Sequence, residues 1–176
     1  MKNRLLLLFI ISIFIIIFII FYKGLKNTNV YTPDIKINKE VPSFTSELFY
    51  SNEVIKSKEI FDLDKFYLLN IWSSWCVPCR QEHSSLMDLV KIKKIKIIGL
   101  NYKDTKKNAE GFLSELGNPF HQIIFDKEGI NAIEWGAYGV PESFLIYDRK
   151  IIKKYIGPLN KPVSYTHLTL PTTPYV

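Results

Sequence analysis

The longest apolar segment of the chain lies near its amino terminus. From Leu5 to Tyr22 the sequence contains no charged residue, and at ~1.5 Å per helical residue the run is about 27 Å long, enough to cross the hydrocarbon core of a bilayer. It is longer than the ~7–15 apolar residues of a signal peptide, and no small-residue cleavage site follows it. We therefore expect residues 1–22 to be an uncleaved signal-anchor transmembrane helix.

The regions on either side of this run carry the same number of basic residues. Two basic residues precede the run and two follow it, namely Lys2, Arg4, Lys23 and Lys26. The positive-inside rule therefore favours a cytoplasmic amino terminus only slightly. Residues 23–42 are rich in Asn, Thr and Lys and predict a polar tether. Residues 43–161 have the length of one compact domain.

Within residues 43–161, strand-like and helix-like apolar patterns alternate. The segments KFYLLNIW (65–72) and IKIIGLN (95–101) are nearly continuous apolar runs, as expected for strands covered on both faces. Between them, one face of a predicted helix that starts at Cys76 carries Leu86, Leu89 and Val90. Two strands joined by a helix predict a βαβ unit, in which the strands are parallel.

A second helix and further strands follow. Apolar residues recur at helical spacing up to the stop signal Gly117, at Ala109, Phe112, Leu113 and Leu116. Three strand-like segments come next, HQIIFD (121–126), SFLIYD (143–148) and IIKKYIG (151–157). Because only Arg149 and Lys150 separate the last two, they predict an antiparallel hairpin. An earlier edge hairpin is expected over about residues 44–48 and 54–60.

This order of elements resembles the thioredoxin fold, an α/β fold with a mixed central sheet flanked by helices. In that fold a final helix covers one face of the sheet, and we expect it to be missing because residues 163–176 replace it. That segment, VSYTHLTLPTTPYV, has no charge and no helical period. One back-translation of it resembles a sequencing-library adaptor, so we expect residues 163–176 to be an artefact.

The formal net charge of +6 does not indicate a nucleic-acid partner. The densest cluster of positive charges is interleaved with isoleucines and has no aromatic platform for bases; it consists of Lys91, Lys93, Lys94 and Lys96. A solvated helix end that runs into a strand explains this pattern.

Both cysteines of the chain lie in the segment WSSWCVPCRQE, directly after the first predicted strand. Cys76 opens the predicted helix, where unpaired N–H groups and the helix dipole favour a thiolate. Pro78 is tolerated there because first-turn N–H groups have no intrahelical acceptor. Cys79 is placed to attack a mixed disulfide formed at Cys76, as two-step thiol–disulfide exchange requires. A C-x-x-C motif between the strand and the helix of a βαβ unit is a specific redox signal.

Two other interpretations of the cysteine pair fit the sequence less well. A zinc site needs four ligands, and only His83 lies nearby. A purely structural disulfide would close a very short loop, which gains little from loop entropy. We expect neither a metal nor another cofactor.

Several segments together resemble the membrane-tethered, thioredoxin-like thiol:disulfide interchange proteins of cytochrome c maturation, the DsbE/CcmG group. They are NIWSSWCVPCRQEH, GLNYKD, GNPF and EWGAYGVPESFLIYDRKIIKKYIGPL, and the resemblance covers about residues 40–160. It implies a single-pass anchor in the bacterial inner membrane. It also implies a cytoplasmic amino terminus and a domain that faces the periplasm.

The resemblance assigns roles to residues outside the dithiol. It implies a cis peptide bond at Pro141, with the backbone of Val140 placed to pair with an extended substrate. It also implies an acidic groove formed by Glu82 and Glu142, which would tune proton transfer at Cys79 and attract the partner. Solvated surface glutamates are the alternative.

Asn70 and the neighbouring aromatic residues complete the candidate site. General thioredoxins place a titratable aspartate at the position of Asn70, so another base must serve, and Glu142 or Glu82 is the nearest candidate. We expect Trp75 to be a partly exposed contact surface and Trp72 to be more buried. Two further aromatics line the same groove or pack in the core: Trp135 and Tyr138.

These observations predict an enzyme, a protein-disulfide reductase. Its expected client is the disulfide of the haem-attachment motif of apocytochrome c, with other haem-ligation components and an integral membrane thiol electron donor as partners. One alternative keeps the fold and changes the client, to copper-site assembly proteins or to general disulfide repair. The other is a non-enzymatic, membrane-tethered metal-binding or assembly factor.

Overall fold

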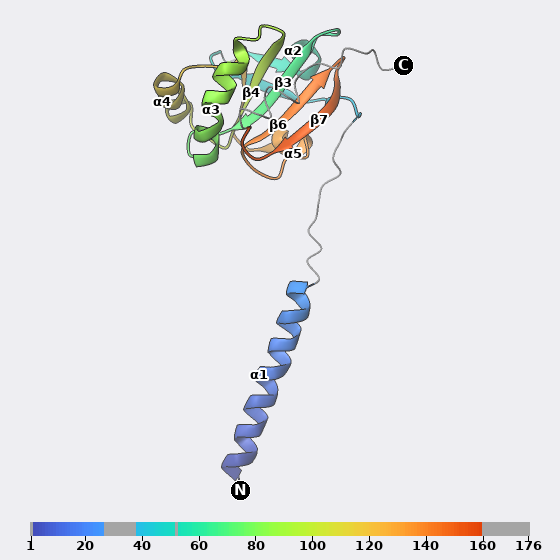
Figure 1. Cartoon of the computed structure of the whole chain (residues 1–176), viewed down its shortest axis with the longest axis vertical. Helices are drawn as coiled ribbons and strands as arrows, with labels where there is room; N and C mark the ends of the chain where they lie inside the picture. Colours follow the sequence, from blue (N-terminus) through green and yellow to red (C-terminus); the bar gives the residue numbers. More distant parts are fainter. Residues whose placement is uncertain (1, 27–37, 52, 160–176) are drawn as a thin grey trace. The chain divides into compact units, whose positions relative to one another are not determined.

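The structure, a computed structural model, describes residues 2–26, 38–51 and 53–159 (Figure 1). It divides into two units, Met1–Thr32 and Pro33–Val176. The expectations for residues 163–176 and for a missing final helix fall outside the described residues.

The described residues of the first unit form one helix, α1 (Lys2–Lys26). Its segment Asn3–Lys23 is long and apolar enough to cross a membrane. Length and composition support this statement, and a signal sequence near the amino terminus would pass the same test. The predicted helix is therefore present, and it continues beyond Tyr22.

The second unit is built on a seven-stranded mixed sheet with the order β2-β1-β5-β4-β3-β6-β7. The inner strand β3 pairs in parallel with β4 and antiparallel with β6, and β4, the central strand, pairs in parallel with β5. The predicted βαβ unit and the predicted β6–β7 hairpin are both confirmed. The strands are β1 (Thr45–Leu48), β2 (Val54–Lys56), β3 (Phe66–Trp72), β4 (Ile95–Tyr102), β5 (Gln122–Asp126), β6 (Glu142–Tyr147) and β7 (Lys150–Ile156).

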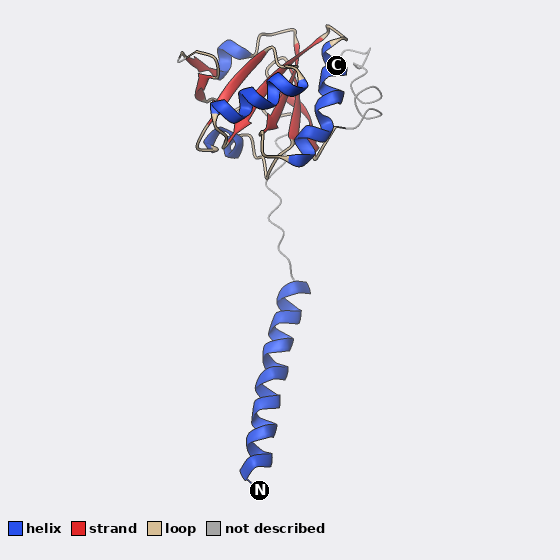
Figure 2. Cartoon of the chain, turned by 90° about the vertical axis from the view of Figure 1, so that its left-hand side faces the viewer, coloured by secondary structure: helices blue, strands red, loops and turns tan. Residues whose placement is uncertain are grey.

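Helices cover both faces of this sheet (Figure 2). Along β3, Leu68 packs with the apolar residues of α3 (Val77–Val90) and α4 (Lys106–Leu116). The next residue, Leu69, packs on the opposite face with those of α2 (Ser57–Ile60) and α5 (Ile130–Glu134). Successive side chains of a strand point to opposite faces. The continuous apolar run of β3 is therefore the consequence of burial on both sides.

Two short helices differ from the sequence expectation. The strand expected to reach residue 60 stops at Lys56, and residues 57–60 form α2. The Glu59 carboxylate accepts the Lys56 N–H at 3.1 Å, which stabilises a helix start rather than a strand. Helix α5 was not anticipated; the Asp126 carboxylate accepts the N–H groups of Asn131 and Ala132 at 3.2 and 2.9 Å and so caps its first turn.

The backbone pairing of the second unit begins before residue 43. Asn38 N–H donates to the Ile151 carbonyl at 2.7 Å, and Ile151 N–H donates to the Lys39 carbonyl at 3.0 Å. Val41 N–H donates to the Arg149 carbonyl at 2.9 Å. The end of the segment expected as a tether therefore adds to the edge of β7, beside the β6–β7 turn.

Gly99, in the middle of β4, lies where a side chain has no room. An added Cβ would lie 2.8 Å from Trp72 Nε1 and 2.9 Å from the Phe120 ring, whereas at Gly111 nothing lies within 4 Å. Gly99→Ala should therefore lower the free energy of unfolding by about 1–3 kcal/mol through overpacking. Gly111→Ala should raise it by about 0.5–1 kcal/mol, because alanine favours the helix. Urea denaturation of the full chain in detergent measures both, and a Gly99→Ala protein as stable as the parent would contradict the packing argument.

Candidate active site at the start of α3

The two cysteines form a disulfide where β3 leads into α3. Cys76 is the N-cap residue of α3, and its Sγ accepts the backbone N–H of Cys79 at 3.1 Å. Pro78 occupies the first turn, where a missing N–H costs no intrahelical bond. When the disulfide is reduced, the same N–H group and the helix dipole favour the thiolate of Cys76.

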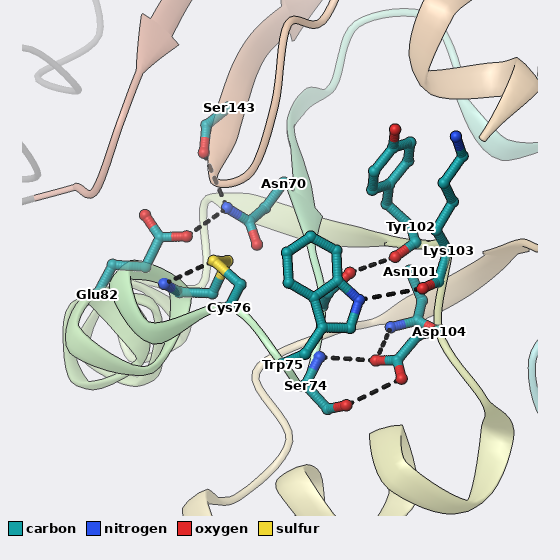
Figure 3. Close-up of a disulfide and its surroundings, with 12 residues drawn as sticks. Asn70, Ser74, Trp75, Cys76, Glu82, Asn101, Tyr102, Lys103, Asp104 and Ser143 are labelled. Atoms are coloured by element: carbon teal, nitrogen blue, oxygen red, sulfur yellow. Dashed lines mark hydrogen bonds between the residues drawn. A yellow bond between two sulfur atoms is a disulfide. The ribbon is translucent and has the colours of Figure 1, made fainter.

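Exposed apolar side chains surround this buried disulfide. Cys76 and Cys79 are both buried, whereas Trp75 is 57% exposed and Val77 is 68% exposed. The Trp75 indole N–H donates to the Lys103 carbonyl at 3.0 Å, which holds the ring beside the dithiol (Figure 3). Trp72 is 1% exposed. The predicted difference between an exposed Trp75 and a buried Trp72 is confirmed.

Glu82 lies one turn along α3 from the disulfide and is 1% exposed. Its carboxylate accepts a bond from Asn70 Nδ2 at 2.9 Å and one from the Leu159 N–H at 2.8 Å. Burial raises the pKa of the Glu82 carboxyl group from 4.5 to about 7, against the opposite effect of these two bonds. Asn70 also donates to the Ser143 hydroxyl at 3.0 Å (Figure 3). A carboxyl group with a pKa of about 7 therefore lies one turn from the dithiol.

Glu142 has a different environment, because it is paired with a buried lysine. Its Oε2 lies 2.8 Å from Lys154 Nζ, and the two side chains are 2% and 3% exposed. Glu142 Oε1 accepts the Tyr138 N–H at 2.8 Å. Lys154 Nζ also donates to the Gly136 carbonyl at 2.7 Å and lies 4.1 Å from the centroid of the Tyr138 ring. The ion pair therefore holds the loop that leads to Pro141.

The acidic groove expected from Glu82 and Glu142 is not formed by these side chains. Both carboxyl groups are buried, Glu82 within a hydrogen-bonded cluster and Glu142 in an ion pair. Burying a carboxylate requires hydrogen bonds or a counter-ion, and the fold provides one solution at each position. The two residues therefore differ in charge environment rather than sharing an exposed surface.

The loop before β6 carries the other expected substrate-contacting residues. The Val140–Pro141 peptide bond is cis, and Val140 packs against the core cluster that contains both cysteines. Tyr138 is partly exposed, whereas Trp135 is buried in the opposite core, against Phe44, Phe61 and Phe144. Of the two aromatics with an open assignment, Trp135 is a core residue.

His83, the residue closest to a zinc-ligand position, is engaged elsewhere. Its Nε2 lies 2.9 Å from the Gly117 carbonyl, and its ring packs edge-on against Phe112. Burial is the main reason that the pKa of His83 lies below its ordinary value. These contacts join α3 to α4. Within the described residues, no group of three or more His, Cys, Asp or Glu could hold a metal ion.

Comparisons with known proteins agree with this geometry. The profile of the Redoxin family matches residues 36–168. The chain belongs to the Redoxin family. It is 32% identical over 155 residues to the thiol:disulfide interchange protein DsbE of Allochromatium vinosum, covering 87% of this chain and 84% of that protein. It is 48% identical over 95 residues to the thiol:disulfide interchange protein CycY of Rhizobium leguminosarum, where the match spans 53% of this chain and 51% of the relative.

A solved structure has the same fold. The crystal structure of a DsbE-type protein from Chlorobium tepidum superposes with a TM-score of 0.61 at 24% identity, covering 75% of this chain and 92% of that one. The Redoxin assignment, the DsbE-type relatives and the C-x-x-C disulfide together make the chain a thiol:disulfide oxidoreductase. The predicted thioredoxin-like fold is confirmed.

Sequence reasoning missed several residues of this Redoxin site. Lys154 faces the core because the β6–β7 pairing shifts register: Ile146 pairs with Ile151, whereas Phe144 pairs with Lys154. A strict two-residue period from Ile151 would have pointed Lys154 to the opposite face of the sheet, and a β-bulge turns it to the face of Phe144. Ser143 and the Leu159 N–H reach the site only through the sheet and the chain beyond β7, and no local pattern marks them.

The raised pKa of Glu82 predicts a pH-dependent stability. The folded protein holds this proton up to about pH 7, whereas the unfolded chain loses it near 4.5. The free energy of unfolding should therefore fall as the pH rises through this window, by roughly 3 kcal/mol from this group. Urea denaturation of the oxidised protein at about pH 5 and pH 8 measures the fall. Glu82→Gln should flatten it, and Glu115→Gln, an exposed carboxylate of α4, should not; an unchanged fall in Glu82→Gln would assign the effect elsewhere.

The buried Glu142–Lys154 pair predicts a large asymmetry between lysine variants. Lys154→Met leaves the Glu142 carboxylate buried without its counter-ion, which should cost about 3–5 kcal/mol of folding free energy. Lys154→Arg keeps the charge and should cost less, and adding Glu142→Gln to Lys154→Met should recover part of the loss. Lys153→Met is the control, because the Nζ of this neighbouring lysine lies 5.1 Å from the centroid of the Tyr155 ring instead. Equal losses at the two lysines would show that the ion pair does not stabilise this loop.

Proposed function

We propose that the chain is a membrane-anchored reductase that faces the periplasm and opens the disulfide of the haem-attachment motif of apocytochrome c. The observation that supports it is a C-x-x-C pair at a helix start, backed by a buried carboxyl group whose pKa lies at about 7, in a chain with DsbE-type relatives. An oxidising compartment closes the C-x-x-C-H motif of a secreted protein, and haem attachment needs two thiols. A reductase is therefore required at this step.

The exchange runs in two steps. The Cys76 thiolate attacks one sulfur of the client disulfide, the client S–S bond breaks, and the first client thiolate leaves and takes up a proton. Cys79 then loses its proton and attacks Cys76 Sγ, which releases the second client thiolate and forms the Cys76–Cys79 disulfide. Two electrons pass from the protein to the client. An integral membrane dithiol returns two electrons and two protons to the pair.

Glu82 is the residue we assign to proton transfer from Cys79. The two side chains lie on successive turns of α3, and Asn70 at the thioredoxin aspartate position cannot titrate. Glu142 has its charge compensated by Lys154, so its role is to hold the loop of Tyr138, Val140 and Pro141. Trp75 and Tyr138 are the exposed aromatics that would contact the client.

The anchor supports the proposed location. Helix α1 would remain in the inner membrane with its amino terminus in the cytoplasm. The dithiol would then face the periplasm, where client disulfides form. Inner-membrane lipid is then a permanent partner, with the electron donor in the same bilayer. Periplasmic clients other than apocytochrome c, such as copper-site assembly proteins, are the second candidate. The exposed side chains next to the dithiol, Trp75 and Val77, are apolar and could contact clients of many sequences.

Cysteine trapping tests the client. The reduced Cys79→Ala chain in detergent should capture an oxidised C-x-x-C-H peptide as a mixed disulfide, because Cys76 can attack but nothing resolves the product. Cys76→Ala should capture none. The matched peptide carries the same disulfide loop with alanine in place of the motif histidine and with altered flanks.

The pattern of capture separates the candidate functions. Preference for the haem-attachment peptide, seen by non-reducing gel and mass spectrometry, supports the proposal. Equal capture of both peptides points to a general disulfide reductase. Capture of neither would leave the thiols without exchange activity and favour the tethered assembly factor.

A further inference from the structure

A second hydrogen-bonded cluster lies beside the dithiol, on the side away from Glu82 (Figure 3). Strands β3 and β4 are parallel and end side by side, with Trp72 opposite Asn101. The loop that leaves β3 leads to Cys76, and the loop that leaves β4 leads to α4. These two loops therefore run next to each other for three residues.

Each of the three residues before Cys76 is hydrogen-bonded to the β4–α4 loop. The Ser73 hydroxyl donates to the Tyr102 carbonyl. Ser74 donates both its backbone N–H and its hydroxyl to Asp104, and the Trp75 indole donates to the Lys103 carbonyl at 3.0 Å. These successive hydrogen bonds restrict the movement of the Ser73–Trp75 loop relative to the end of β4.

Asp104 is the centre of this cluster. Its carboxylate, 8% exposed, accepts the Ser74 N–H at 2.6 Å and the Ser74 hydroxyl at 2.9 Å. It also accepts Asn101 Nδ2 at 3.2 Å and the Thr105 N–H at 2.8 Å. Four donors converge on one carboxylate, and hydrogen bonds to an ionised acceptor are about twice as strong as neutral ones.

The geometry points to Asp104 as a positioning residue of thiol–disulfide exchange, acting through the Ser73–Trp75 loop on Cys76. The start of α3 favours the thiolate of Cys76, because the Cys79 N–H donates to its Sγ there. In the oxidised protein the disulfide itself holds the loop against α3. Reduction removes that crosslink, and the bonds to Asp104 then keep Cys76 in place.

This role concerns the attacking thiolate and not the client, so it holds whichever protein is reduced. The β4–α4 loop also restrains the exposed side chain of Trp75. The same β4–α4 loop that fixes Ser74 holds the Trp75 ring through Lys103. Asp104 therefore sets the position of the nucleophile and of the exposed aromatic next to it.

The test measures the reactivity of Cys76 as a function of pH. In the full chain in detergent, Cys79→Ala leaves Cys76 as the only thiol, and its alkylation by iodoacetamide reports the thiolate. Adding Asp104→Asn should slow alkylation at neutral pH by about tenfold, the cost of a lost charged hydrogen bond, and move the midpoint of the pH–rate profile upward. Ser74→Ala keeps the backbone bond and should do the same to a smaller extent. Asp62→Asn, an exposed carboxylate paired with Lys65, should change nothing.

The direction of the shift distinguishes positioning from charge. If Asp104 acted on Cys76 only through its negative charge, its removal would favour the thiolate and move the midpoint downward. A downward or absent shift in Asp104→Asn overturns the inference. If that variant does not fold, as judged by near-ultraviolet circular dichroism, Ser74→Ala decides the question. An upward shift there supports the role of Asp104, and an unchanged profile overturns it.

Discussion

The parallel pairing of β3 with β4 is the constraint on which the active site depends. Parallel strands end at the same edge of a sheet, so the loop that carries Cys76 leaves next to the loop that carries Asp104. On its other side β3 pairs antiparallel with β6, which places Ser143 opposite Asn70 at that same edge. Three segments far apart in the sequence thereby surround one dithiol. Each is held by backbone pairing as well as by side-chain contacts.

Burial gives similar side chains different chemistry around that dithiol. Glu82 and Glu142 are almost equally buried, but Glu82 meets only neutral donors and Glu142 meets an ammonium group. Desolvation dominates at Glu82, so its carboxyl group can hold a proton near neutral pH. The charge of Glu142 is compensated by Lys154. Asp104, a third buried carboxylate, is satisfied by four donors. Three buried carboxyl groups thus have three different environments: neutral donors at Glu82, an ammonium counter-ion at Glu142 and four hydrogen-bond donors at Asp104.

The dithiol belongs to the core on one face of the sheet. The cysteines pack in the core beneath α3 and α4, with Leu68, Leu86 and Trp72. Trp135 packs in the opposite core, beneath α2 and α5. The contacts of His83 with Gly117 and Phe112 join α3 to α4. The helix that presents Cys76 is therefore braced by a neighbouring helix as well as by the sheet.

By itself, the sequence determined the features that depend on local pattern. Apolar periodicity identified the membrane-type helix and the central βαβ unit, and the C-x-x-C segment at a strand–helix junction identified the redox pair, because these signals lie within single elements. It even indicated the contrast between Trp72 and Trp75. It did not anticipate α5, which the distant Asp126 carboxylate caps, or the early end of β2, where the Glu59 carboxylate stabilises a helix start.

Only the tertiary structure decided what surrounds the dithiol. A β-bulge turns Lys154 toward Glu142, and nothing in its own segment marks the bulge. Strand pairing brings Ser143 to Asn70, and the chain after β7 brings the Leu159 N–H to Glu82. The pKa of a carboxyl group depends on desolvation and on partners from distant segments. A sequence motif therefore locates the cysteine pair, whereas the fold sets the environment of each acidic residue around it.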